Sequence, residues 1–104
     1  MSLLSIFGFG KSKIKEALQH GAVVIDVRTP NEFDQGHVPK SLNIPVDRIS
    51  ISVQRIKDMD KPVIFCCASG TRSGMAVSMM KQHGFKEVYN GGSWMSVLKL
   101  LKKL

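Results

Sequence analysis

The segment that most constrains the fold is residues 62–74, which read Pro-Val-Ile-Phe-Cys-Cys-Ala-Ser-Gly-Thr-Arg-Ser-Gly. A run of apolar and β-branched residues ends at a cysteine, and a short loop of small residues leads to an arginine and a segment compatible with a helix. A strand, a tight loop and a helix start together aim several backbone N–H groups at one point. A cysteine at that point is favoured as its thiolate, which is the nucleophilic form. The segment therefore predicts a strand–loop–helix unit built around a reactive cysteine.

The two cysteines of the chain, Cys66 and Cys67, are adjacent in this segment. Counted from Cys67 to Arg72 the loop has C-x4-R spacing, and counted from Cys66 it has C-x5-R spacing. Successive side chains of a strand point to opposite faces of the sheet, so only one of the two thiols faces the loop. The spacing alone leaves both registers open.

Segments typical of strands and helices alternate along the chain, without internal repeats, low-complexity tracts or linkers. Apolar runs predict strands at residues 22–27, 42–44, 63–66 and 87–90. Helical spacing and end signals predict helices at residues 12–20, 29–36, 46–58, 72–83 and 93–103. The alternation predicts one α/β domain over residues 1–104, with a mainly parallel sheet flanked by helices. Ligands of such sheets bind beyond the carboxyl ends of the strands, where Cys67 lies.

Two of these segments carry more specific end signals. Thr29 and Glu32 have the spacing of a capping box, with Pro30 in the first turn of the helix. The Gly91-Gly92 pair is expected to turn the chain after the last strand. Along the closing helix, one apolar side is expected to contain Leu98, Leu101 and Leu104.

Composition excludes several classes of protein. No run approaches the roughly 20 apolar residues needed to span a bilayer, and the apolar residues 1–10 lack the basic leader and cleavage site of a signal peptide. Two adjacent cysteines cannot staple distant parts of a fold, so a reducing cytoplasm is the expected location. The net charge of +7 is spread along the chain without a nucleic-acid-binding motif, and it favours small anionic substrates.

A small basic cluster lies near the end of the chain, at Lys99, Lys102 and Lys103. These lysines are interpreted as a solvated helix face, with docking to an acidic partner protein as the alternative.

Several segments in a fixed order point to one family. They are Val-Ile-Asp-Val-Arg at 24–28 with Glu32-Phe33, Gly-His-Val-Pro at 36–39, Leu-Asn-Ile-Pro at 42–45, Cys-Ala-Ser-Gly-Thr-Arg-Ser at 67–73, and Gly91-Gly92 with Trp94. Over residues 12–98 the chain resembles a single-domain rhodanese, a thiosulfate or persulfide sulfurtransferase. It departs from the family pattern at Lys40, where glycine is frequent, and at Cys66, an unusual second thiol.

The resemblance implies a rhodanese-like three-layer domain with a C-x4-R loop and Cys67 as the sulfur carrier. It implies a small anionic sulfur donor, thiosulfate or a persulfide, and a thiol or cyanide acceptor, including an acceptor protein; it implies no metal or cofactor. Displacement at divalent sulfur requires a thiolate and a cradle for the persulfide anion rather than a general acid. The residues expected to bind the substrate are Ser69, Gly70, Thr71, Arg72 and Ser73.

Four further residues are predicted to support this site. Arg28 lies near the expected pocket and is assigned to anion binding. Asp26 is interpreted as part of an ion pair or capping network, and Glu32 as the second residue of the capping box. His37 is expected to be a hydrogen-bonded loop histidine rather than a metal ligand or base. For Cys66, core packing is favoured over a redox role.

Two other functions stay open beside sulfur transfer. The C-x5-R spacing from Cys66 matches phosphatases of the same fold, although Phe65 stands where those enzymes have histidine. A non-catalytic rhodanese-like regulatory module is the second alternative, although inactive members typically lose the cysteine that this chain keeps. Within sulfur transfer, a persulfide relay to a specific protein is not separated from turnover of small thiols.

Overall fold

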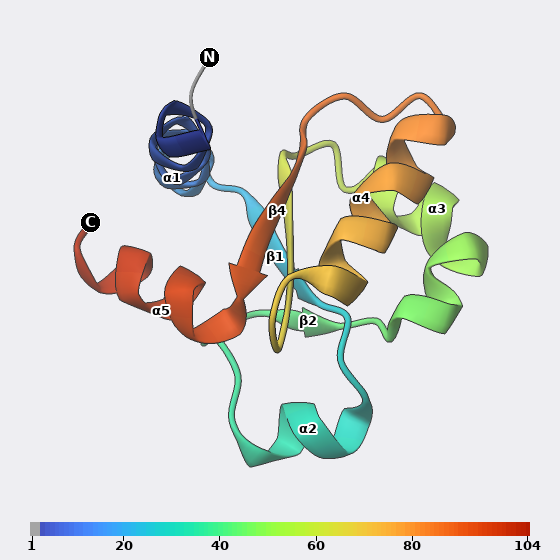
Figure 1. Ribbon diagram of the computed structural model, residues 1–104. Helices are drawn as coiled ribbons and strands as arrows, with labels where there is room; N and C mark the ends of the chain where they lie inside the picture. Colours follow the sequence, from blue (N-terminus) through green and yellow to red (C-terminus); the bar gives the residue numbers. More distant parts are fainter. Residues whose placement is uncertain (1–2) are drawn as a thin grey trace.

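A computed structural model describes residues 3–104 and contains a four-stranded, fully parallel sheet with strand order β2-β1-β3-β4 (Figure 1). The strands are β1 Val23–Asp26, β2 Leu42–Asn43, β3 Val63–Cys67 and β4 Val88–Ser93. β1 and β3 lie in the middle of the sheet and are almost wholly apolar, which is typical of parallel strands covered on both faces. The α/β fold with a parallel sheet is therefore as predicted.

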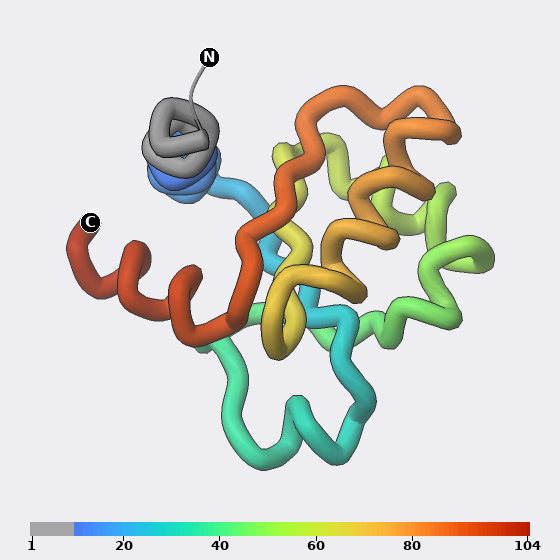
Figure 2. The backbone as a smooth tube through the Cα atoms, in the orientation of Figure 1, coloured from blue at the N-terminus to red at the C-terminus, as the bar shows by residue number. Residues whose placement is uncertain are grey.

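Helices cover both faces of the sheet and give the domain its three layers (Figure 1). One face is covered by α1 Leu3–Gln19 and α5 Trp94–Lys102 (Figure 2), and these two helices contact each other. The other face is covered by α3 Ile49–Asp58, which follows a 3₁₀ turn at Val46–Arg48, and by α4 Thr71–Gln82. The short helix α2 Pro30–Gln35 lies beyond the carboxyl edge of the sheet, near the loop that follows β3 (Figure 1).

Each face of the sheet has its own apolar core, because strand side chains alternate between the two faces. Phe65 and Cys67 pack with the α3 and α4 side, whereas Ile64 and Cys66 pack with the α1 and α5 side. The two cysteines therefore lie on opposite faces of β3. None of the helices within residues 3–104 is long and apolar enough to cross a membrane.

The helix boundaries differ from the predictions in two places. α1 begins at Leu3 rather than at residue 12, so that most of the apolar opening segment is helical; its first two residues lie outside the described chain. Interior glycines lower helix propensity by about 1 kcal/mol each without forbidding a helix. Leu104 lies past the end of α5 and is 51% exposed, so Val97, Leu98 and Leu101 form the packed side of that helix.

The prediction that Gly91 and Gly92 turn the chain is wrong. β4 continues through both glycines to Ser93, with a register shift against β3 between Phe65 and Cys67. A Cβ on Gly91 would lie 2.7 Å from Cγ2 of Val97 and 2.8 Å from Cγ2 of Ile64. The glycine therefore serves close packing within a bulged strand, which a local turn signal does not distinguish from a turn.

Candidate active site

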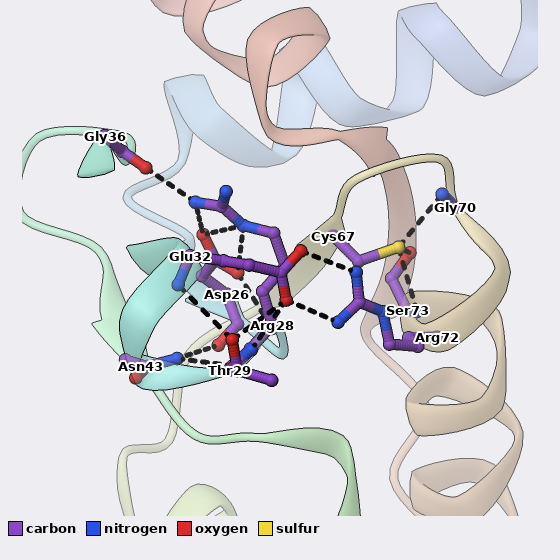
Figure 3. A network of polar contacts seen from close by, with 10 residues as sticks. All are labelled: Asp26, Arg28, Thr29, Glu32, Gly36, Asn43, Cys67, Gly70, Arg72 and Ser73. Atoms are coloured by element: carbon purple, nitrogen blue, oxygen red, sulfur yellow. Dashed lines mark hydrogen bonds and ion pairs between the residues drawn. The ribbon is translucent and has the colours of Figure 1, made fainter. Parts of the chain in front are cut away.

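The loop between β3 and α4 curls around the sulfur of Cys67 (Figure 3). Its Sγ accepts a hydrogen bond from the backbone N–H of Gly70 at 2.9 Å and from that of Ser73 at 3.5 Å. The hydroxyl oxygen of Ser73 lies 3.3 Å from the same sulfur. Gly70 has φ +100°, a left-handed conformation that favours glycine, and it directly precedes α4. Backbone N–H groups of the loop therefore converge on the Cys67 sulfur, as the loop sequence predicts.

The same donors determine the pKa of Cys67. Burial raises the pKa of this thiol, but hydrogen bonds from the Ser73 side chain and from the backbone N–H groups of Ser73, Ser69 and Gly70 outweigh it and lower the pKa below its usual value. The positive end of the α4 dipole also lies at this loop. Cys67 is 1% exposed. The loop therefore stabilises the thiolate of Cys67 relative to the thiol.

Cys66 lies in the core on the other face of β3, as predicted from strand alternation. It is fully buried against the apolar side chains that α1 and α5 bring to the sheet. Burial is the main reason why the pKa of its thiol is raised to about 12. Cys66 is thus a neutral thiol at physiological pH, with the properties of a small apolar side chain.

Asn90 on β4 fixes the loop, and it is not among the residues that the sequence predicts for this site. Its Oδ1 accepts hydrogen bonds from the Ser73 hydroxyl at 2.7 Å and from Gly92 N–H at 2.9 Å, and its Nδ2 donates to Gly70 O at 3.0 Å. These contacts fix Ser73 and Gly70, both of which contact Cys67. Asn90 is the polar residue that ends the strand predicted at residues 87–90. Because the carboxyl ends of parallel strands lie at one edge of the sheet, this position could have indicated a residue near the Cys67 loop.

Arg72 pairs with Glu32 of α2 (Figure 3). Its Nη1 and Nη2 donate to the two carboxylate oxygens at 2.7 and 3.0 Å. Thr29 caps α2 and completes the predicted capping box with Glu32. The hydrogen bond from Arg72 is the main reason why the pKa of Glu32 is lowered to about 2. Arg72 therefore fixes the loop to α2, and Glu32 both caps α2 and pairs with Arg72.

Asp26 and Arg28 form a buried ion pair at the end of β1. Arg28 Nε lies 3.0 Å from both Asp26 carboxylate oxygens, and Nη2 donates to Asp26 Oδ2 at 2.7 Å and to Gly36 O at 2.6 Å. Its guanidinium carbon also lies 4.9 Å from the centroid of the Trp94 ring. The hydrogen bond with Asp26 is the main cause that raises the pKa of Arg28.

This arrangement differs from the anion-binding role predicted for Arg28. Asp26 pairs in register with Cys66, so it holds Arg28 on the α5 face of the sheet. None of the described hydrogen bonds of the Arg28 side chain reaches the Cys67 loop. Asn43 adds to the network, because its Nδ2 donates to the backbone oxygens of Asp26 and Arg28. The pair joins β1, β2 and the segment after α2, as the network interpretation of Asp26 predicts.

His37 is an exposed loop residue bonded to the backbone. Its Nδ1 donates to Phe33 O at 2.7 Å, and its ring stacks on that of Phe33 with centroids 3.7 Å apart. Within the part of the chain that the structure describes, no three His, Cys, Asp or Glu side chains gather as ligands of a metal ion.

A parallel α/β domain with a cysteine cradled at the end of a central strand defines the class of protein, and comparison with known sequences defines the family. The model of the rhodanese-like domain matches residues 11–96, so the chain belongs to the rhodanese-like family. The fold class and the resemblance read from the motifs are confirmed.

Named relatives match about two thirds of the chain. The chain is 41% identical over 69 residues to the uncharacterized protein YqhL of Bacillus subtilis, covering 66% of this chain and 54% of that protein. It is 35% identical over 72 residues to the thiosulfate sulfurtransferase GlpE of Pseudomonas syringae, covering 69% of this chain and 67% of the relative. The chain thus spans about half to two thirds of the length of these curated relatives.

A solved structure described as a rhodanese with anions from E. coli is also similar. It superposes with a TM-score of 0.67 at 28% identity, covering 73% of this chain and 91% of that chain.

Proposed function

We propose that this protein is a rhodanese-type sulfurtransferase that carries a sulfane sulfur on Cys67. The observation that carries the proposal is the convergence of the Gly70 N–H and the Ser73 N–H on the Cys67 sulfur, with the Ser73 hydroxyl oxygen 3.3 Å from it. Such an arrangement stabilises a thiolate and, one bond further out, a persulfide anion. Relatives named as thiosulfate sulfurtransferase and sulfurtransferase support the same class of reaction.

In the first step the Cys67 thiolate attacks the outer sulfur of thiosulfate. A new S–S bond forms to Cys67, the bond between the two sulfurs of thiosulfate breaks, and sulfite leaves with the bonding electron pair. No proton transfer is needed, since sulfite leaves as a dianion and the persulfide stays an anion. A persulfide donor reacts in the same way, with a thiolate as the leaving group.

In the second step an acceptor thiolate, or cyanide, attacks the outer sulfur of the Cys67 persulfide. The S–S bond to Cys67 breaks, the acceptor leaves as a persulfide or as thiocyanate, and the Cys67 thiolate is regenerated. The backbone N–H groups of residues 69–73 hold the outer sulfur between the two steps. Asn90 and Arg72 are positioning residues, because they fix the loop and do not contact the sulfur.

The two alternative functions have less support. A C-x5-R phosphatase needs Cys66 as a thiolate inside the loop, but its side chain lies on the far face of β3 and burial raises its pKa to about 12. A non-catalytic module has no need for a cysteine whose pKa is lowered by a set of aimed donors.

Intact-protein mass spectrometry after incubation with thiosulfate tests the proposal. We expect a mass gain of one sulfur atom in the wild type and in Cys66→Ala, and none in Cys67→Ser. Cyanide should remove the added sulfur and release thiocyanate. Loading of Cys67→Ser, or an absence of loading in a correctly folded wild type, contradicts the proposal.

A further inference from the structure

A groove of about 590 Å³ lies directly beside the Cys67 loop. One wall is formed by the outer side of the loop, at Ser69, Gly70 and Thr71, and continues into β4. The opposite wall is formed by α1 and α5, which lie side by side on this face of the sheet (Figure 1). The buried side chain of Ile14 and the partly buried Leu100 contribute apolar surface to it.

The charged side chains that line this groove are all positive. Lys11 on α1 and Lys99 and Lys103 at the end of α5 line it, and no carboxylate does. All three lysines are exposed, and none forms a salt bridge with a carboxylate among the residues that the structure describes. Lys99 and Lys103 are four residues apart, so they lie on the same side of α5, about one turn from each other. Lys102 does not line the groove.

The size of the groove exceeds the needs of the sulfur donor. Clefts of about 300–1,000 Å³ bind drug-sized ligands, whereas thiosulfate consists of only five heavy atoms. A separate basic groove is therefore not required for loading Cys67. It is suited to the larger of the two reaction partners, and its lysines select for negative charge on that partner.

We propose that this groove binds an acidic segment of a protein sulfur acceptor and so brings the acceptor thiol to the Cys67 loop. The inference rests on the proposed sulfurtransferase function and names its acceptor. Carboxylates close in sequence to the acceptor cysteine pair with Lys11, Lys99 and Lys103, and the cysteine reaches over Gly70 to the outer sulfur of the persulfide. The chemistry is the second step above, in which the acceptor thiolate gains the sulfur and Cys67 is regenerated.

The test uses cysteine-containing peptides as acceptors of sulfur from preloaded protein. One peptide has two glutamates on each side of its cysteine, and its partner has glutamines at the same positions. In Lys99→Glu/Lys103→Glu we expect kcat/KM for the glutamate peptide to fall about tenfold, because two attractive pairs become repulsive. The glutamine peptide should change by less than about twofold, and salt should weaken the preference for the glutamate peptide.

The matched control is Lys81→Glu/Lys102→Glu, which makes the same change in net charge at the carboxyl ends of α4 and α5 but outside the groove. An equal loss in this control would assign the effect to the general field of the protein and overturn the proposal. Equal rates for the two peptides with the wild type would also overturn it. If glutathione, a small thiol with two carboxylates, showed the same dependence on Lys99 and Lys103, the groove would be a small-molecule site instead.

Two further measurements separate this inference from the proposed function. Thiosulfate loading of Lys99→Glu/Lys103→Glu should equal that of the charge-matched control Lys81→Glu/Lys102→Glu; failure of the wild type to load at all contradicts the sulfurtransferase function itself. Binding of a fluorescent glutamate peptide with serine in place of cysteine, measured on Cys67→Ser protein, tests the groove without chemistry. We expect salt-sensitive binding that Lys99→Glu/Lys103→Glu weakens, and an absence of binding would overturn the groove assignment alone.

Discussion

Cys66 and Cys67 are neighbours in one buried strand, yet their side chains lie in different surroundings. Both are almost completely buried, with 0% and 1% exposure. Burial among apolar side chains is the main reason why the pKa of Cys66 is raised to about 12; the charge of Asp26 raises it further, and Arg28 offsets only part of the effect. For Cys67 the effect of burial is outweighed by hydrogen-bond donors, and its pKa is lowered.

The difference shows that burial alone does not decide whether a thiol reacts. What separates the two residues is the direction in which strand alternation points each side chain. One direction leads to the core between the sheet and α5, and the other to a loop whose backbone N–H groups are aimed inward.

Selective alkylation compares the two thiols directly. The pKa of Cys66 is raised to about 12 and that of Cys67 is lowered, so at neutral pH the thiolate fraction of Cys67 is far larger than that of Cys66. We expect iodoacetamide to modify Cys67 alone in the folded protein, as measured by peptide mass mapping. The rate should decrease as the pH falls through the lowered pKa of Cys67, because only the thiolate reacts. Comparable modification of Cys66 without unfolding would remove the distinction between the two sites.

Gly91→Ala should lower the stability of the protein, because the residue packs closely against its neighbours. The added Cβ meets the side chains of Val97 and Ile64 at 2.7 and 2.8 Å, and both are stiff β-branched residues. We expect a loss of about 1–3 kcal/mol in the free energy of unfolding, measured by urea denaturation. Gly10→Ala is the control, since its Cβ would contact nothing within 4 Å and alanine favours a helix. A neutral Gly91→Ala would mean that β4 does not approach β3 so closely.

Ser73→Ala should affect the chemistry rather than the stability. It removes the hydroxyl beside Cys67 Sγ, so the pKa of Cys67 rises and the rate of sulfur loading at neutral pH falls about tenfold. Asn90 Oδ1 still accepts from Gly92, which limits the cost in stability. Ser69→Ala is the control, because Ser69 acts through its backbone N–H. A pH profile of loading should move to higher pH in Ser73→Ala only, and an unshifted profile would exclude the hydroxyl from stabilising the thiolate.

Glu32→Gln should have the smallest effect, since glutamine keeps a capping side chain and loses only the charge paired with Arg72. Folding lowers the pKa of Glu32 from 4.5 to about 2, so the ionised carboxylate stabilises the fold above about pH 4.5 and this contribution is lost as the pH falls toward 2. We expect the wild type to melt a few degrees higher at most than the variant at pH 7. The two should melt together near pH 2, and a difference that persists there would point to a cause other than the ion pair.

Much of the fold and part of the site could be predicted from local sequence patterns. Apolar runs and capping signals located the strands and α2, because each depends on residues close together in the chain. The same patterns could not identify Asn90, whose contacts with Gly70 and Ser73 join β4 to a loop 17–20 residues earlier. They also could not assign Arg28, because its direction depends on Asp26, Gly36 and Trp94 together.

Residue type and order are enough to place a cysteine at the end of a buried strand, before a loop able to stabilise a thiolate. Which groups act on that loop depends on contacts between segments that are far apart in the chain. Arg72 pairs with Glu32, 40 residues away, and Asn90 holds the loop from the neighbouring strand. The lysine-lined groove likewise exists only because α1 and α5, from opposite ends of the chain, pack together on one face of the sheet.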